Sequence, residues 1–133
     1  MVEEKIKELG FQLQETPKPL AAYIPAIRID NFIFTSGQLP IVDGKLKYAG
    51  RIGENLSEEE GKLAAQIAVL NCLSTVKSIV NNLDKIEQIV KLTVYINSST
   101  TFTNQPEIAN GASELLINIF GEKGKHTRSA VGV

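Results

Sequence analysis

The longest regular pattern in this chain is an apolar stripe that begins just after Ser57. Ser57 is a good helix N-cap, and Glu60 stands three residues on, which is the capping-box arrangement that satisfies two free backbone amides. Apolar residues then recur every three or four positions, at Leu63, Ile67, Leu70, Leu73, Val76, Val80 and Leu83. This spacing predicts an amphipathic helix of about 25 residues, whose stripe must be buried against other elements.

A strand and a second helix are predicted after it. Residues 86–97 alternate between apolar and polar side chains, as a half-buried strand does. Asn104 is a second N-cap, Pro106 lies in the first turn, and Gly121 stands where the helix ends. The glycine-containing residues 121–124 then lead into a final strand.

Two hairpins are predicted in the first half of the chain. Strand candidates Tyr23–Ile29 and Phe32–Ser36 are joined by Asp30-Asn31, two residues that tolerate positive φ. Asp43-Gly44 is a second turn of this kind. Before them, the segment Thr16-Pro17-Lys18-Pro19 is expected to be an extended linker, because proline also disfavours helix at the residue before it.

The order of strands, helix, strand, helix and strand predicts one α+β domain over residues 1–133, a sandwich with both helices on one face of a mixed sheet. Residues 2–9 form either a short helical turn stopped by Gly10 or the lead into a first strand. The uncovered sheet face is expected to be buried against another subunit. Its expected apolar residues include Ile24, Ala26, Ile33 and Val133.

Composition excludes several classes of function. The formal net charge is −1 and the basic residues are scattered, so no nucleic-acid footprint is visible. One cysteine and one histidine leave no internal disulfide and no multi-histidine metal site within a chain. We see no apolar run near the roughly 20 residues of a membrane span and no signal peptide, so we expect a cytoplasmic protein without membrane contact.

The final stretch, His126 to Val133, carries the candidate chemistry. Period-two alternation places Arg128, Ala130 and Gly132 on one strand face. The guanidinium there has two small neighbours, so it can hold a carboxylate or phosphate bidentately with room for the rest of a ligand. A surface salt bridge is the alternative interpretation.

Several segments together resemble the Rid/YjgF family. Tyr23 lies before a strand whose successor reads Phe34-Thr35-Ser36-Gly37-Gln38-Leu39-Pro40. Asn110 lies near the start of the second helix, and the last strand is His-Thr-Arg-Ser-Ala-Val-Gly-Val. These are similar to the reactive-intermediate imine deaminases, also labelled endoribonuclease L-PSP or translation-inhibitor-like. The match runs from about residue 11 to the end and suggests a subgroup distinct from the best-characterised deaminases.

The resemblance implies a chorismate-mutase-like fold that assembles as a homotrimer around an inner barrel, with ligand clefts between subunits. Arg128 would hold the carboxylate of a small ligand, helped by backbone amides near Gly37 and Ala130. Tyr23 of the adjacent subunit would position the hydrolytic water, and Ser36 and Asn110 would line the pocket. No metal or organic cofactor is implied.

The activity implied is that of a 2-iminobutanoate/2-iminopropanoate deaminase, which hydrolyses a small enamine or imine acid to a 2-keto acid and ammonia. Two features depart from the family. Ala130 stands where deaminases carry a cysteine, and the chain stops at Val133, before the strand that carries the family's water-activating Glu. Either the natural C-terminal strand is missing from this sequence, which is the alternative we expect, or the protein lacks that Glu.

Alternatives remain for the function and for single residues. A carboxylate sensor or chaperone-like binder without catalysis could use the same trimer. A ribonuclease or translation inhibitor is disfavoured, because acid–base cleavage usually needs two proton-transfer groups. Ser36 could simply cap a turn, and Asn110 could bond locally. His126 is expected to face solvent from a loop, although its nearness to Arg128 could place it at the rim of the cleft.

Overall fold

The computed structural model describes residues 1–16 and 22–133, so residues 17–19 of the expected linker lie outside the described part. Its helices are α1 (Val2–Glu8), α2 (Glu58–Val80) and α3 (Gln105–Phe120), with the 3-10 turns η1 (Leu83–Lys85) and η2 (Gly121–Gly124). Its strands are β1 (Ala26–Ile29), β2 (Phe32–Thr35), β3 (Ile41–Val42), β4 (Lys45–Leu46), β5 (Lys91–Ile96) and β6 (Thr127–Gly132).

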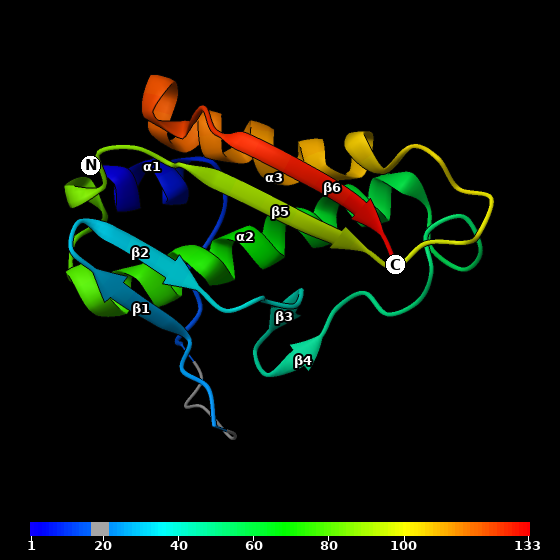
Figure 1. Cartoon of the computed structure of the whole chain (residues 1–133), viewed down its shortest axis with the longest axis horizontal. Helices are drawn as coiled ribbons and strands as arrows, with labels where there is room; N and C mark the ends of the chain where they lie inside the picture. The colour runs from blue at the N-terminus through cyan, green and yellow to red at the C-terminus, as the bar shows by residue number, and fades with distance from the viewer. Residues whose placement is uncertain (17–21) are drawn as a thin grey trace.

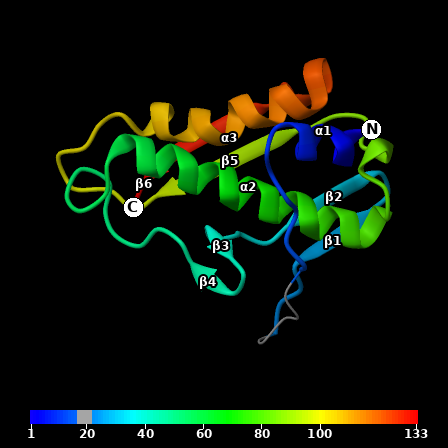
Figure 2. The same cartoon turned by 180° about the vertical axis from the view of Figure 1, so that it is seen from behind.

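The molecule is a layer of helices with strands on one side of it. Figure 1 looks onto the strands, and Figure 2 looks onto α2 and α3 from behind. The expected placement of both helices on one face is therefore confirmed. The single mixed sheet is not seen, because the described strands form three two-stranded ladders: antiparallel β1-β2, antiparallel β3-β4 and parallel β5-β6.

Helix α2 begins at the predicted capping box. The Ser57 side chain accepts a hydrogen bond from the backbone N–H of Glu60 at 3.1 Å, and the Glu60 carboxylate accepts from the Ser57 N–H at 3.1 Å. Asn81, with φ 65°, ends the helix. By length and hydropathy α2 could cross a bilayer, contrary to the expectation from apolar runs, yet its buried residues form the core with α3.

Both predicted turns are present. Asp30 has φ 52°, and Asp43 and Gly44 have φ 51° and 77°, the positive values that two-residue hairpins require. The first strand starts at Ala26, later than the predicted Tyr23. The partner strand ends at Thr35, so no ladder reaches the earlier residues.

The predicted strand over 86–97 is shorter than expected and starts at Lys91. The side-chain amide of Gln88 donates to the backbone carbonyls of Ile89, Lys123 and Lys125, which ties this segment to η2 and the residue after it instead of to a strand. Asn104 does precede α3, but its side chain makes no cap bond and donates to Glu58 at 2.8 Å.

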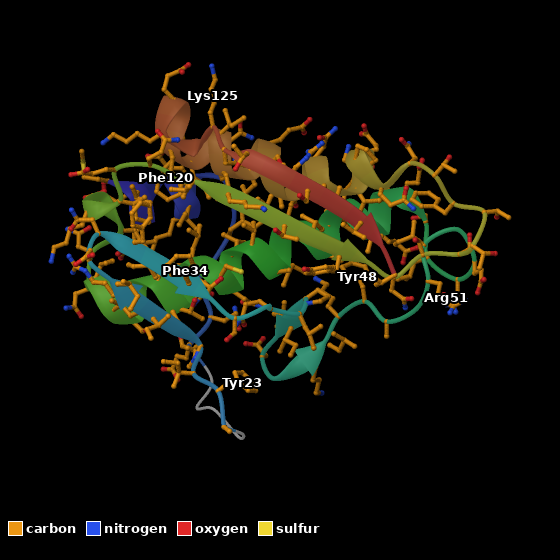
Figure 3. The ribbon with its side chains drawn as sticks, viewed as in Figure 1. Tyr23, Phe34, Tyr48, Arg51, Phe120 and Lys125 are labelled. Atoms are coloured by element: carbon orange, nitrogen blue, oxygen red, sulfur yellow. The ribbon has the colours of Figure 1, made fainter. Side chains whose placement is uncertain are left out.

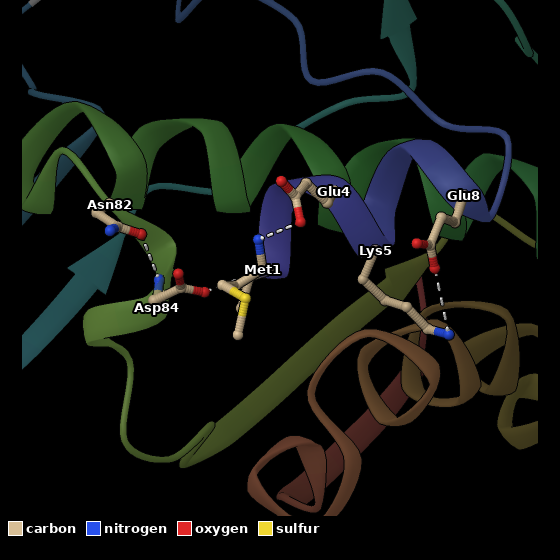
Figure 4. Close-up of polar contacts among 7 residues, drawn as sticks. Met1, Glu4, Lys5, Glu8, Asn82 and Asp84 are labelled. Atoms are coloured by element: carbon tan, nitrogen blue, oxygen red, sulfur yellow. Dashed lines mark hydrogen bonds and ion pairs between the residues drawn. The ribbon is translucent and has the colours of Figure 1, made fainter.

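Residues 2–8 form a helix, which decides the alternative left open for the N-terminus. Ile6, 1% exposed, enters the core between α2 and α3. Figure 4 shows the polar contacts at this end of the molecule. The backbone N–H of Val2 donates to Asp84 of η1 at 2.8 Å, so α1 is fixed to the turn that follows α2.

The open face of the strands is apolar, as predicted, but with partly different residues. Ile24 and Val133 are 53% and 63% exposed, whereas Ala26 is half-buried. Ile33 packs against the helical core, because Phe32 and Phe34 occupy the open face on either side of it. The exposed apolar residues of the two longer ladders are Ile27, Ile29, Phe32, Phe34, Tyr95 and Val131.

Candidate functional site

Strand β6 places Arg128 on the helix side of its ladder. Arg128, Ala130 and Gly132 stand opposite Leu92, Val94 and Ile96 of β5. Ala130 packs against the small core cluster of Ile52, Ile96 and Ile108, which lies between strands and helices. The predicted alternation of β6 is therefore confirmed, and the Arg128 side chain extends toward α3 while remaining exposed.

Two neutral oxygen atoms of α3 hold the guanidinium of Arg128. Its Nη1 donates to Oδ1 of Asn110 at 2.7 Å and to Oγ of Ser113 at 3.2 Å. These two bonds use both hydrogens of Nη1. Among the described residues, no carboxylate pairs with Arg128 and no acceptor is bonded to its Nε or Nη2. The charge is thus uncompensated, and the Nε–Nη2 edge is available to an anion.

The carboxylate of Glu107 also belongs to this hydrogen-bond network, but its charge is paired with Lys62 and not with Arg128. Asn110 donates from Nδ2 to Oε2 of Glu107 at 3.2 Å, while Lys62 of α2 donates to Oε1 of Glu107 at 2.9 Å. The hydrogen bond and charge of Lys62 lower the pKa of Glu107, and the same hydrogen bond raises the pKa of Lys62. Asn110 therefore separates the Lys62–Glu107 ion pair from Arg128 and is fixed in its amide orientation by both sides.

Ser113 also contacts His126. Its Oγ lies 2.9 Å from Nε2 of His126, and Nδ1 of His126 lies 2.6 Å from the carbonyl oxygen of Gly124. His126 is half-buried, so the expectation that it faces solvent is wrong. The reason is that η2 turns back over α3 and brings the imidazole onto Ser113.

The backbone of β6 adds a second donor. Thr127 and Val133 donate their N–H groups to Val90 and Ile96, so alternate residues from Thr127 on pair with β5. By this alternation the N–H groups of Arg128 and Ala130 point to the opposite edge of β6. No described strand pairs with that edge.

The remaining predicted residues lie apart from Arg128 in a single chain. Tyr23, 60% exposed, lies beyond the lower end of the β1-β2 hairpin in Figure 3. Ser36 donates its hydroxyl hydrogen to the carbonyl of Ile24 at 2.6 Å, a contact to a residue twelve positions earlier and not the cap of a local turn. Gly37 borders open space, so its backbone is approachable. Arg128, Asn110 and Ala130 thus come together, while Tyr23, Ser36 and Gly37 form a separate group.

The sequence reasoning missed Ser113, Glu107 and Lys62. Glu107, Asn110 and Ser113 follow one another at intervals of three, which places them on one face of α3. That spacing was the available signal. Within the described residues, no group of three His, Cys, Asp or Glu side chains could hold a metal ion.

The geometry can be set beside known proteins. The family model described as "YjgF/chorismate mutase-like, putative endoribonuclease" matches residues 3–132. The chain belongs to the YjgF family. This YjgF-family chain is 37% identical to Protein TCP17 of Trypanosoma cruzi, over 99% of this chain and 83% of that protein. It is 30% identical to a RutC family protein of Pyrococcus abyssi, over 96% and 84% of the two chains.

Two solved structures share this YjgF-family fold. A protein of unknown function from Agrobacterium tumefaciens has a TM-score of 0.92 at 37% identity, covering 99% of this chain and 82% of that one. A protein described as a "putative endoribonuclease" from Shewanella oneidensis has a TM-score of 0.96 at 33% identity, covering 100% and 88%. The expected family and its fold are therefore confirmed.

Proposed function

We propose that this YjgF-family protein hydrolyses small enamine or imine carboxylic acids, of the 2-aminoacrylate type, to a 2-keto acid and ammonia. The observation that carries the proposal is the state of Arg128. Neutral oxygens hold it through Nη1, and its Nε–Nη2 edge is left for a ligand. A carboxylate fits that edge with two parallel charge-assisted hydrogen bonds.

The reaction needs little beyond positioning. The enamine carbon takes up a proton while the nitrogen gives one up, so the molecule becomes an imine. Water then adds to the imine carbon, its second proton goes to the nitrogen, and the C–N bond breaks as the hydroxyl proton leaves, which releases ammonia and leaves the keto group. Such compounds already hydrolyse in water, so holding the carboxylate and the attacking water in place supplies the useful part of the catalysis. Arg128 would orient the substrate, and the N–H of Ala130 would support the carboxylate from the strand edge.

The complete site in this proposal lies between copies of the chain, in a homotrimer. Tyr23 is remote from β6 within one chain (Figure 3), so a neighbouring copy would have to bring Tyr23, Ser36 and Gly37 to Arg128. The exposed apolar face defined above, with Phe34 60% and Tyr95 70% exposed, supports such a partner. A cytoplasmic location belongs to this proposal, since the substrate class is metabolic.

Ribonuclease activity, the name carried by some relatives, has weaker support. RNA cleavage by acid–base chemistry usually needs two proton-transfer groups. Both ring nitrogens of His126, the single histidine of the chain, are engaged by Ser113 and Gly124.

The proposal is tested by supplying 2-aminoacrylate in situ from a dehydratase and measuring keto-acid release. Arg128→Ala is compared with Arg51→Ala, a matched control, because Arg51 pairs with Glu54. Its neighbour Ile52 bonds to Asn97 just after β5, whereas Arg128 stands opposite Leu92 near the start of the ladder. We expect wild type and Arg51→Ala to exceed the spontaneous rate and Arg128→Ala to fall to it. No turnover by wild type, with carboxylate binding retained, would instead favour the non-catalytic binder.

A further inference from the structure

We propose that Ser113 and His126 are positioning residues that fix the orientation of the Arg128 guanidinium, through a directed chain of hydrogen bonds that ends on the carbonyl of Gly124. The inference rests on the proposed function only for the identity of the ligand. The geometry itself concerns three side chains and one backbone atom, all among the described residues.

The direction of each hydrogen bond follows from donor and acceptor chemistry. The Gly124 carbonyl can only accept, so Nδ1 of His126 carries a hydrogen and donates to it across 2.6 Å. In the neutral imidazole Nε2 is then an acceptor, and the Ser113 hydroxyl donates to it across 2.9 Å. The Ser113 oxygen therefore presents its lone pairs to the Nη1 of Arg128 at 3.2 Å.

The hydrogen-bond chain ends at Gly124, which is held in place by packing. Gly124 is buried, and a methyl group at its Cα would overlap the backbone carbonyl of Leu116 in α3, so η2 is pressed onto that helix. Ser113 is 8% exposed on α3. The acceptor that Arg128 meets is thus fixed by two packed elements, not by a side chain that solvent can reorient.

These contacts fix the orientation of the Arg128 guanidinium. Asn110 and Ser113 together take both hydrogens of Nη1, so the guanidinium cannot turn about its Cδ–Nε axis without breaking two bonds. The Nε–Nη2 edge then faces the ligand position before any ligand arrives. Preorganisation of this kind improves affinity by removing the ordering cost from the binding step.

His126 could instead serve only to stabilise the loop through its bond to Gly124. Two substitutions distinguish this structural role from the positioning role. In His126→Gln the side-chain oxygen can accept from Ser113 at the position of Nε2, while the bond to Gly124 is lost. In His126→Asn the side-chain amide can donate to Gly124 at the position of Nδ1, while the acceptor for Ser113 is lost. Positioning requires the Ser113 contact; loop stabilisation requires the Gly124 contact.

The test combines nitrogen NMR of the imidazole with titration of 2-oxobutanoate, the keto acid that the proposed reaction would release from the four-carbon substrate 2-iminobutanoate. His126 is the single histidine, so its ring nitrogens give one assignable set of signals. We expect the Nδ1–H tautomer in wild type. We expect His126→Gln to bind within about twofold of wild type, and His126→Asn and Ser113→Ala to bind about three- to tenfold more weakly, the range for loss of one neutral hydrogen bond.

An Nε2–H tautomer, or His126→Asn binding as wild type does while His126→Gln does not, would overturn the inference. If wild type binds no 2-oxobutanoate, the proposed function fails separately. Relaxation of the Arg128 Nε–H signal then decides the positioning role: it is expected to report a rigid guanidinium in wild type and a mobile one in Ser113→Ala. Equal mobility in both would overturn it.

Discussion

Gly111 of α3 lies directly against the backbone carbonyl of Lys62 in α2. A methyl group at Gly111 would overlap that oxygen, so only glycine permits the helices to come this close. The neighbouring residue on α3 is Asn110, which bonds Arg128, and Lys62 itself pairs with Glu107. The close contact of α3 with α2 therefore fixes the position of Asn110 and Glu107 relative to Lys62.

Gly111→Ala is expected to destabilise the protein. Alanine in a helix interior is favoured over glycine by roughly 0.5–1 kcal/mol, but a clash with backbone cannot be relieved by rotating a side chain and costs about 1–3 kcal/mol or more. Urea denaturation measures the balance. Gly37→Ala is the control, because Gly37 borders open space and its substitution should leave stability nearly unchanged. Higher stability in Gly111→Ala would contradict the described packing.

The two helix N-caps should respond differently to alanine. Ser57→Ala removes the bond to the Glu60 N–H and is expected to cost about 1 kcal/mol. Asn104→Ala removes no cap bond, only the contact to Glu58, so it should cost clearly less. Thermal unfolding of the two variants side by side checks this ranking, and equal losses would argue against the capping assignment.

Glu107→Gln should lower stability in a pH-dependent way. Lys62 lowers the pKa of Glu107 below its ordinary 4.5, so the ionised group stabilises the fold above that pH. This contribution is lost as pH falls below 4.5 and through the lower pKa of the folded state. The raised pKa of Lys62 keeps its own share present below pH 10.5 and lost only above it.

Urea midpoints measured from about pH 7 down to about pH 3 test this sign. The wild type should be the more stable protein near neutrality, and the gap to Glu107→Gln should close on acidification. A gap that stays constant over the range would show that the Lys62–Glu107 pair contributes nothing through its charge.

Phe34→Asp should weaken self-association if the open strand face is the subunit interface. Phe34 is 60% exposed in one chain, and an aspartate there would place a charge in the buried interface. Light scattering after size exclusion is expected to show a trimer for wild type and smaller species for the variant. Lys45→Asp, an exposed change on β4, serves as the control. A wild-type monomer would refute the trimer.

Local chemistry made much of this fold predictable. The capping box at Ser57 and the turns at Asp30-Asn31 and Asp43-Gly44 depend on residues close in sequence, and the structure has all three. The strand start at Lys91 was missed because it depends on Gln88 bonding to residues after α3. The orientation of Ile33 was missed because alternation alone does not say which face of a strand the helices cover.

The candidate site was also predictable only in part from the sequence. Arg128 and Asn110, which the resemblance paired with one ligand, do contact one another. The contact of Ser113 with His126 was not foreseen, because it requires η2 to turn back over α3, and nothing in the periodicity of either segment specifies that turn. Whether Tyr23, Ser36 and Gly37 join Arg128 depends on an assembly that the sequence of one chain does not encode locally.

The most direct test of the account is the affinity of wild type, Arg128→Ala and Arg51→Ala for 2-oxobutanoate, measured by calorimetric titration. This titration measures carboxylate binding by Arg128 separately from the hydrolysis step. Hydrogen bonds to charged groups contribute about 1.5–3 kcal/mol, so Arg128→Ala should bind at least about tenfold more weakly, with Arg51→Ala unchanged. Equal affinity of wild type and Arg128→Ala would contradict the central claim that the free edge of Arg128 is the carboxylate site.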